Sequence, residues 1–535
     1  MKKILVMISF LSAVNCYSAQ SDNFNYSVSL NPLNIPGLPG LHSFVIAKDK
    51  DKWLVIGGRK DGLHAKQPFR SFPGTENNTD IYVIDVSLKK FWSATVMDLP
   101  LSLKEQLQSG NMNFYQDGNS LFITGGYAFS ESENEHITFP FLTSVSVHEL
   151  IKAVINGNPL RPFFKQIKDN VFAVTGGQMG KIGNTFYLIG GQRFDGRYNP
   201  MGHRTFTQTY SDGFRKFKIN NSDTHLSYSD LEIITDEVHL HRRDFNLLPQ
   251  IFPDGSYGYT VSSGVFQTNI NLPYLYPVDI NASGYKPVTS FNQHLCNYHS
   301  AKAFLYDKKK NQMNTLFFGG ISMYYLSGGE LRMDRNVPFV KTISRLTRNA
   351  DGSLHESALT SEMPSFIGAN AEFIPDRKLP FSSDGIININ KIKGDSVLIG
   401  YIYGGIVSTG SGPFTQNNSE STYAGNIVYE VRLIKNKLLQ NTLIDGSNPY
   451  SVKIIYDGSS DLLSAELDIP YDGTSDLWVT DESGKIVFEK TIKSLKKGRQ
   501  IAELSDINII IDGEYSFNFL FDHKFAFTEK LLINN

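Results

Sequence analysis

The densest cluster of titratable side chains in this chain is HLHRRDFN, at residues 239–246. It sets Arg243 beside Asp244, and an arginine fixed by a neighbouring carboxylate can hold a ligand carboxylate through two parallel hydrogen bonds. Acid–base chemistry would need a partner across the site, for which His299 is the candidate. We therefore expect Arg243 to govern ligand binding. In the alternative, the Arg243–Asp244 pair is structural and only stabilises the turn that contains it.

These residues belong to a wider polar set, in which each member stands where an inner strand of the fold should begin. The set is His42, Asn111, Gln178, Arg243, Asp244, His299 and Asn370. If the inner strands surround a central channel, these side chains ring its mouth, where several can donate and accept hydrogen bonds. The set is our candidate ligand-binding site. Alternatively, it satisfies inner-strand backbone groups and trapped water.

Long loops should crowd the same face as these residues. They are RKDGLH (59–64), SESENEH (130–136), QRFDGRYNPMGHR (192–204) and ISMYYLSGGELRMDR (321–335). Loops on a rigid scaffold are where binding usually resides. Their mixture of Arg, Asp, His and Tyr suits a polar ligand such as a sugar or a peptide. The alternative for any single loop is a solvated surface, which is the commoner role of a charge-rich loop.

A repeated pattern indicates the elements that position these residues. Short runs of β-branched and aromatic residues end in a glycine pair at WLVIGG (Gly58), SLFITGG (Gly126), TFYLIGG (Gly191), TLFFGG (Gly320) and VLIGYIYGG (Gly405), and YGYTVSSG (Gly264) has serine as its first member. The units recur roughly every 69 residues, and such a unit must stack on its neighbours to bury its apolar face. Strand-rich units of this size predict an all-β fold, the β-propeller.

The first unit carries the clearest family pattern. After Gly57 and Gly58 come Tyr82, Asp85 and Trp92, at the spacing of a Kelch repeat. Tyrosine and tryptophan bring large apolar areas to the contact between blades. The chain resembles Kelch proteins, which implies a six-bladed Kelch-like β-propeller over residues 24–445. Its sixth unit should span 370–445, and the segment 26–33 should add an outer strand that closes the ring.

The composition changes after Gly446, where short alternating strands and Asp-Gly turns predict a small β-sandwich over residues 448–535. This part resembles the sorting domain of type IX secretion substrates in DESGKIVFEK (481–490), DGEYSFNF (512–519) and TEKLLI (528–533). The usual Pro-Asn-Pro opening is missing, and Tyr456-Asp457-Gly458 stands near its place. The resemblance implies export through that machinery and loss of this domain at the cell surface. The alternative is an accessory domain that is kept.

The N-terminus reads as a signal peptide over residues 1–19, with Lys2 and Lys3 before an apolar core and Gln20 as the new first residue. We expect a secreted or cell-surface protein with no transmembrane segment, because no later apolar run is long enough to span a bilayer. Once the signal is removed, Cys296 is the single cysteine, so no intrachain disulfide is expected.

The composition also limits the partners. Lys and Arg number 51 against 53 Asp and Glu, a net charge of −2, so nothing indicates a nucleic-acid binder. The segment 293–300 contains His294, Cys296, Tyr298 and His299, but strand alternation places His299 on the opposite face from the others. We expect no metal and no cofactor.

Two functions remain open. The first is an exported propeller that binds a glycan or protein partner on the looped face around its channel. The second is a carbohydrate-active enzyme, such as a mutarotase, epimerase or lyase, with a polar site in the channel. A catalytic site should converge in one deep pocket, whereas a binding surface should be broad.

Overall fold

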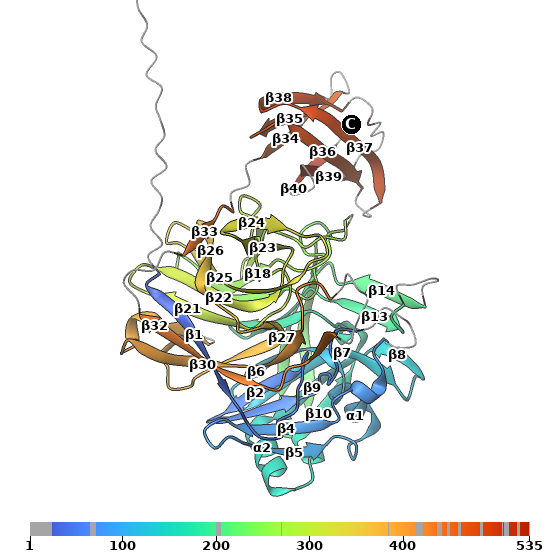
Figure 1. Ribbon diagram of the computed structural model, residues 1–535. Helices are drawn as coiled ribbons and strands as arrows, with labels where there is room; N and C mark the ends of the chain where they lie inside the picture. The colour runs from blue at the N-terminus through green and yellow to red at the C-terminus, as the bar shows by residue number, and fades with distance from the viewer. Residues whose placement is uncertain are drawn as a thin grey trace, which may run out of the picture.

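The computed structural model describes residues 24–64, 71–199, 205–268, 270–383, 385–413, 421–435, 441–446, 450–457, 462–481, 485–504, 507, 513–521 and 525–533. The expected signal peptide lies outside these ranges, as do parts of the 192–204 loop and of the DESGKIVFEK and DGEYSFNF segments. The described residues form an all-β protein in which antiparallel strand pairs dominate, with α-helices at α1 (Leu101–Leu107) and α2 (Val147–Asn156) (Figure 1). No helix among them is long and apolar enough to cross a membrane.

Antiparallel sheets follow one another along the first part of the chain. Each has a main path of four paired strands, and the first strand in sequence lies at one edge. Sheet one contains β2 (Val45–Asp49), β3 (Lys52–Ile56), β4 (Asp80–Asp85) and β5 (Lys90–Thr95). Sheet two contains β6 (Gly110–Asp117), β7 (Ser120–Ser130), β9 (Phe141–Ser146) and β10 (Phe164–Lys168). Sheet three contains β11 (Gln178–Ile182), β12 (Thr185–Ile189), β15 (Gly213–Asn221) and β16 (Leu226–Thr235), and sheet four contains β17 (Asn246–Ile251), β18 (Tyr257–Ser262), β19 (Val278–Asn281) and β20 (Gly284–Pro287).

Sheet five is larger because segments from elsewhere in the chain join it. Its consecutive strands are β21 (Lys302–Asp307), β22 (Gln312–Ile321), β25 (Phe339–Arg348) and β26 (Leu354–Glu362). On the β21 side it gains β29 (Ile386–Asn388) and β28 (Phe381–Ser383), and on the β26 side it gains β33 (Thr442–Ile444). We expected residues 370–445 to belong to the sixth unit, and for β28, β29 and β33 this was wrong. A three-residue strand has no periodicity that assigns it to one edge rather than another.

Sheet six joins the two ends of this part of the chain. Its strands are β27 (Phe366–Pro375), β30 (Ser396–Ser408), β32 (Val428–Lys435) and the N-terminal β1 (Tyr26–Leu33). β1 pairs with β32 in one continuous antiparallel register, from Tyr26 with Lys435 to Leu33 with Val428, and Figure 1 shows the blue strand beside the orange one. The expectation that residues 26–33 supply an outer strand is confirmed.

Short strand pairs extend from the connections between second and third strands. β8 (Glu135–Thr138) pairs with β7, and β31 (Thr422–Ala424) pairs with β30. β13 (Gln192–Gly196) and β14 (Phe206–Tyr210) form one hairpin, and β23 (Tyr324–Ser327) and β24 (Glu330–Met333) form another. Three of the four long loops predicted from the sequence, 130–136, 192–204 and 321–335, therefore contain strand residues.

The glycine pairs join each sheet to the next. Gly57 and Gly58 have φ angles of 68° and 88°, which favour glycine. A Cβ on Gly57 would stand 2.7 Å from the Ser109 carbonyl oxygen, and the Gly58 N–H donates to that oxygen at 2.8 Å. In the same way, the last glycine of other units donates its N–H to a carbonyl oxygen in the segment that opens the following sheet. These bonds run from Gly126 to Val174, Gly191 to Arg242, Gly264 to Asn297 and Gly405 to Leu41. The last of these returns from sheet six to sheet one.

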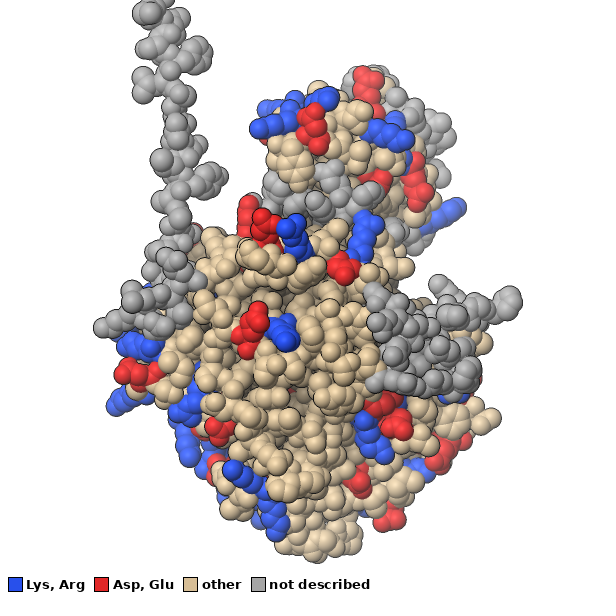
Figure 2. Space-filling model, viewed as in Figure 1, with Lys and Arg blue, Asp and Glu red and all other residues tan. Residues whose placement is uncertain are grey.

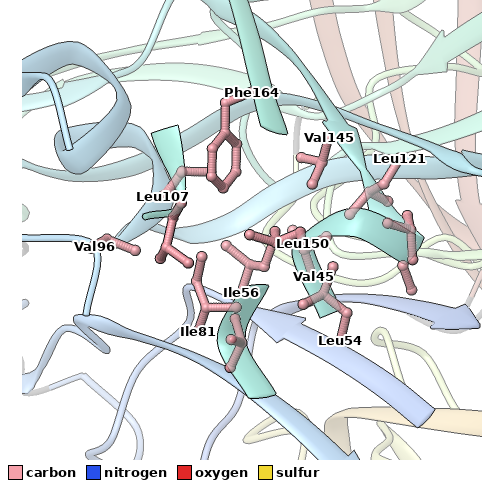
Figure 3. Packing of buried hydrophobic residues seen from close by; sticks show 14 of the residues in the cluster. Val45, Leu54, Ile56, Ile81, Val96, Leu107, Leu121, Val145, Leu150 and Phe164 are labelled. Carbon is pink, nitrogen blue, oxygen red and sulfur yellow. The ribbon is translucent and has the colours of Figure 1, made fainter. Parts of the chain in front are cut away.

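Apolar side chains fill the spaces between sheets. Figure 3 shows one such core, in which Val45, Leu54 and Ile56 of sheet one pack with Leu121 of sheet two and Leu150 of α2. α2 leaves sheet two, between β9 and β10, and covers sheet one with its apolar face. Each apolar surface is therefore buried only by its neighbour, as a stacked repeat requires.

The C-terminal residues form two further antiparallel sheets around a single core. One contains β34 (Ser451–Asp457), β35 (Leu462–Ile469) and β38 (Gly498–Glu503); the other contains β37 (Ile486–Leu495), β36 (Gly473–Thr480), β39 (Gly513–Phe521) and β40 (Phe525–Ile533). Val452 and Ala465 of the first sheet pack with Leu477, Val479 and Phe517 of the second. Sheets with one shared apolar face make a unit with its own core, drawn in red in Figure 1.

Candidate functional site

A closed circle of backbone hydrogen bonds lies where the six inner strands begin. Each bond runs from the N–H of one sheet's residue to the carbonyl oxygen of the preceding sheet's. The bonds are Asn111 to Ser43, Gly176 to Asn111, Asp244 to Gly176, His299 to Asp244, Asn370 to His299 and Ser43 to Asn370, with N···O distances of 3.0, 3.3, 2.7, 2.6, 3.0 and 3.4 Å. We call these six residues the central ring. Four of them, Asn111, Asp244, His299 and Asn370, were in the predicted set.

The backbone of the central ring explains much of its polarity. Ser43, Asn111, Gly176, Asp244 and Asn370 have φ angles of 57°, 53°, 67°, 52° and 51°. Asparagine, aspartate and glycine tolerate this left-handed region better than apolar residues, because a short polar side chain can bond locally. At these positions the sequence pattern reflects backbone geometry. His299 has no such angle among the positive-φ residues, so its side chain needs another explanation.

A cavity of about 230 Å³ lies directly beside the central ring. Its lining includes Asn111, Gln178, Asp244 and His299 of the predicted set, together with Lys302 and Glu372, which were not predicted; the rings around them are Phe44, Phe114, Tyr115, Tyr257, Tyr259 and Phe304. The volume is far above the 10–15 Å³ that one water needs. The cavity therefore combines convergent polar groups with aromatic walls, which is usual for a ligand site.

His299 and Glu372 form the central polar pair of this cavity. Nε2 of His299 lies 3.2 Å from Oε1 of Glu372, and their side chains are 22% and 18% exposed. Burial alone would raise the pKa of Glu372, but the charges of His299 and Lys302 and the hydrogen bond from His299 hold that pKa below its usual value. Glu372 is therefore an ionised acceptor beside an imidazole that can donate or accept a proton.

Lys302 completes the pair as a buried cation. Its Nζ donates to the Ser300 carbonyl oxygen at 3.2 Å, and burial lowers its pKa while the charge of Glu372 raises it. Sequence reasoning missed Lys302 and Glu372 because it considered only the residue that opens each strand. The available signal was a single charged residue inside an apolar inner strand, in HSAKAFLYD (299–307) and NAEFIPD (370–376).

Arg243 lies elsewhere, among loop residues. Its Nε donates to the Tyr210 hydroxyl at 3.0 Å, its Nη1 pairs with Asp244, and its guanidinium stands 5.3 Å from the centre of the Phe266 ring. Burial would lower the pKa of Arg243, but the Asp244 carboxylate raises it. We expected His299 to be the partner of Arg243 and Asp244, and the imidazole contacts Glu372 instead. The contacts of Arg243 favour the alternative, in which the Arg243–Asp244 pair is structural and holds its own turn.

The remaining predicted residues are bound to their surroundings. His42 is buried, with Nδ1 at 2.9 Å from the Ser43 hydroxyl and Nε2 at 3.5 Å from an oxygen of Asp61, and burial lowers its pKa. Gln178 donates to the Phe245 carbonyl oxygen and accepts from the Leu247 N–H, so it ties sheet three to sheet four. Structural bonding therefore accounts for these two side chains.

Cys296 is not part of a cluster of metal-ligating side chains among the described residues. Burial raises the pKa of its thiol to about 12, and its Sγ lies 2.9 Å from the Ser300 hydroxyl. Within the described ranges, no group of three or more His, Cys, Asp and Glu side chains is placed to hold a metal ion.

Charged residues of both signs are scattered over the face seen in Figure 2.

No protein-family model and no curated protein sequence matches the chain. Among solved structures, the one titled "Structure of YjhT" is similar over 77% of this chain and 99% of its own, with 12% sequence identity and a TM-score of 0.42. The functional argument therefore stands on the residues of the site.

Proposed function

We propose that this protein binds a small carbohydrate in the cavity beside the central ring. The observation that carries the proposal is the His299–Glu372 pair, with Lys302, set among aromatic rings in one cavity. Hydroxyl groups of a sugar both donate and accept hydrogen bonds, so they match a carboxylate, an imidazole and an ammonium group placed together. The aromatic rings offer apolar faces to the C–H face of a sugar ring.

The proposal includes the architecture expected from the sequence. In it, sheets one to six are the blades of a Kelch-like propeller, residues 24–445, and the C-terminal sheets are a β-sandwich, residues 448–535. The central ring has one residue in, or within three residues before, each inner strand, which supports six blades around one axis. Export through a signal peptide and a type IX sorting domain, and a secreted or cell-surface location, remain part of this proposal.

The site differs in one respect from the binding function expected on the looped face. The cavity belongs to the channel itself, where we placed the alternative, enzymatic function. The His299–Glu372 pair specifically favours that second candidate, because an ionised carboxylate and an imidazole side by side can move a proton. In a mutarotase, Glu372 would take the proton of the anomeric hydroxyl while protonated His299 gives one to the ring oxygen, and the ring C–O bond would open and close again.

Saturation-transfer NMR with a panel of monosaccharides tests binding, and exchange between anomers in the same spectra tests catalysis. Glu372→Gln removes the charge that accepts a ligand hydroxyl, so binding should weaken about tenfold to a hundredfold, the range for a hydrogen bond to a charged group. Glu362→Gln is the matched control, because Glu362 is exposed on β26. Equal binding by the two variants, or no binding by the wild type, would refute the proposal.

A further inference from the structure

The central ring closes the channel to anything as large as a sugar. Residues joined by one strand-like N–H···O bond have Cα atoms about 5 Å apart, so a hexagon of six is roughly 10 Å between opposite Cα atoms. The backbone atoms of the ring take up much of that width, and the side chains of Ser43 and Asn111 stand at its edge beside the cavity. The remaining opening admits water but not a pyranose ring.

The cavity lies on one side of this barrier only. Its inner-strand lining comes from central-ring residues or from residues that follow them in the sequence, such as Phe44, Lys302 and Glu372. The residues directly before the ring, His42 and Arg243 among them, are not in the lining. Because inner strands run from the ring toward their hairpins, the cavity is a blind pocket that opens on the hairpin side, away from the long loops.

The lining of the pocket carries more carboxylate than ammonium groups. The carboxylates in the lining are Asp244 and Glu372. Asp244 is ion-paired with Arg243, and Oε1 of Glu372 lies 3.2 Å from Nε2 of His299. Among the described lining residues, Lys302 is the one Lys or Arg, and its Nζ already donates to the Ser300 carbonyl oxygen at 3.2 Å. A ligand carboxylate would therefore lie beside two carboxylates with one ammonium group to oppose them, and like charges in one site disfavour each other.

We infer that the ligand is an uncharged sugar unit with a free end: a monosaccharide, or the terminal residue of a chain, entering from the hairpin side. A blind pocket gives a bound unit one exit, whereas an internal unit of a polysaccharide must continue in two directions. The inference rests on the proposed carbohydrate-binding function and narrows its ligand class.

The test uses the full mature chain and two matched ligand sets. The first set compares neutral hexoses and N-acetylhexosamines with the uronic acids of the same rings. The second takes the neutral unit that binds and places it at the end, or in the middle, of otherwise equivalent trisaccharides. Affinity is measured by calorimetry or NMR titration for the wild type, Glu372→Gln and the Glu362→Gln control.

The expected result is binding of the neutral unit alone and at a chain end, at least tenfold weaker binding when the same unit is internal, and binding weakened about tenfold to a hundredfold in Glu372→Gln only. Equal affinity for the internal unit would overturn the blind pocket, and tighter binding of a uronic acid would overturn the charge argument. In both of those cases the proposed function would stand. If no sugar of the panel binds, the proposed function fails together with the inference.

Discussion

The left-handed backbone of the central ring predicts an unusual order of stabilities among proteins with different substitutions at Asn370. Its φ angle is 51°, and its side chain is outside the cavity lining. Alanine adds no atoms to the ring but lacks the local hydrogen bonding that eases the left-handed region, which costs L-residues about 1–2 kcal/mol. Asn370→Ala should therefore lose about 1 kcal/mol, Asn370→Gly should be nearly neutral, and Asn370→Val should be worst because its side chain is β-branched.

Differential scanning calorimetry at one scan rate measures this order. For a body of about 400 residues, 1 kcal/mol corresponds to about 1 °C in Tm, so replicate scans are needed. Asn156 is the control, because it ends α2, is exposed and lacks a positive φ, and there glycine should be less stable than alanine. If Asn370→Ala proves as stable as Asn370→Gly, backbone geometry does not explain the polar ring, and a ligand must.

Three other expectations can be checked directly. Arg243→Lys should lower Tm by losing the Tyr210 bond and the Phe266 contact while leaving sugar affinity unchanged; unchanged Tm with weaker binding would restore Arg243 as a ligand residue. Burial raises the pKa of Glu356 from 4.5 to about 8, so the folded state keeps a proton that the unfolded chain loses, and stability should fall as pH rises from 4.5 through 8. Glu356→Gln should flatten that fall in pH-dependent melting curves, and identical curves for both proteins would contradict the assignment. Mass spectrometry of surface-released protein should find Gln20 at the N-terminus and no peptides beyond about residue 450, whereas an intact C-terminus would indicate an accessory domain.

The sheet succession could be predicted from sequence because its geometry restricts residue choice. Gly57 and Gly58 occupy positive φ angles, and Gly57 meets the next sheet where a Cβ would collide, so the repeat leaves a glycine signature. The signature is incomplete, because Ser263 stands in place of the first glycine of its pair although its φ is 54°. The position of β33 left no trace at all, because pairing at a sheet edge is chosen by tertiary contacts rather than by composition.

Only some of the residues of the candidate site could be predicted from the sequence. Of the seven polar residues expected at the openings of the inner strands, four lie in the central ring: Asn111, Asp244, His299 and Asn370. Their polarity has two causes, left-handed backbone at Asn370 and side-chain chemistry at His299. Glu372 and Lys302 become meaningful only when different sheets bring them to the same cavity. Spatial convergence of residues about seventy positions apart cannot be read from either strand alone.

The pairing of β1 with β32 sets a time order for the making of this protein. Tyr26 is among the first described residues to be synthesised, and its partner Lys435 follows about four hundred residues later. Sheet six therefore stays incomplete, with the edge of β32 unoccupied and β1 without a partner, until nearly the whole first part of the chain has emerged. Such distant contacts slow folding far more than they cost stability. We expect the docking of the first strand onto the last to be the slow step of folding, so the chain stays open for a long interval after most of it has been synthesised.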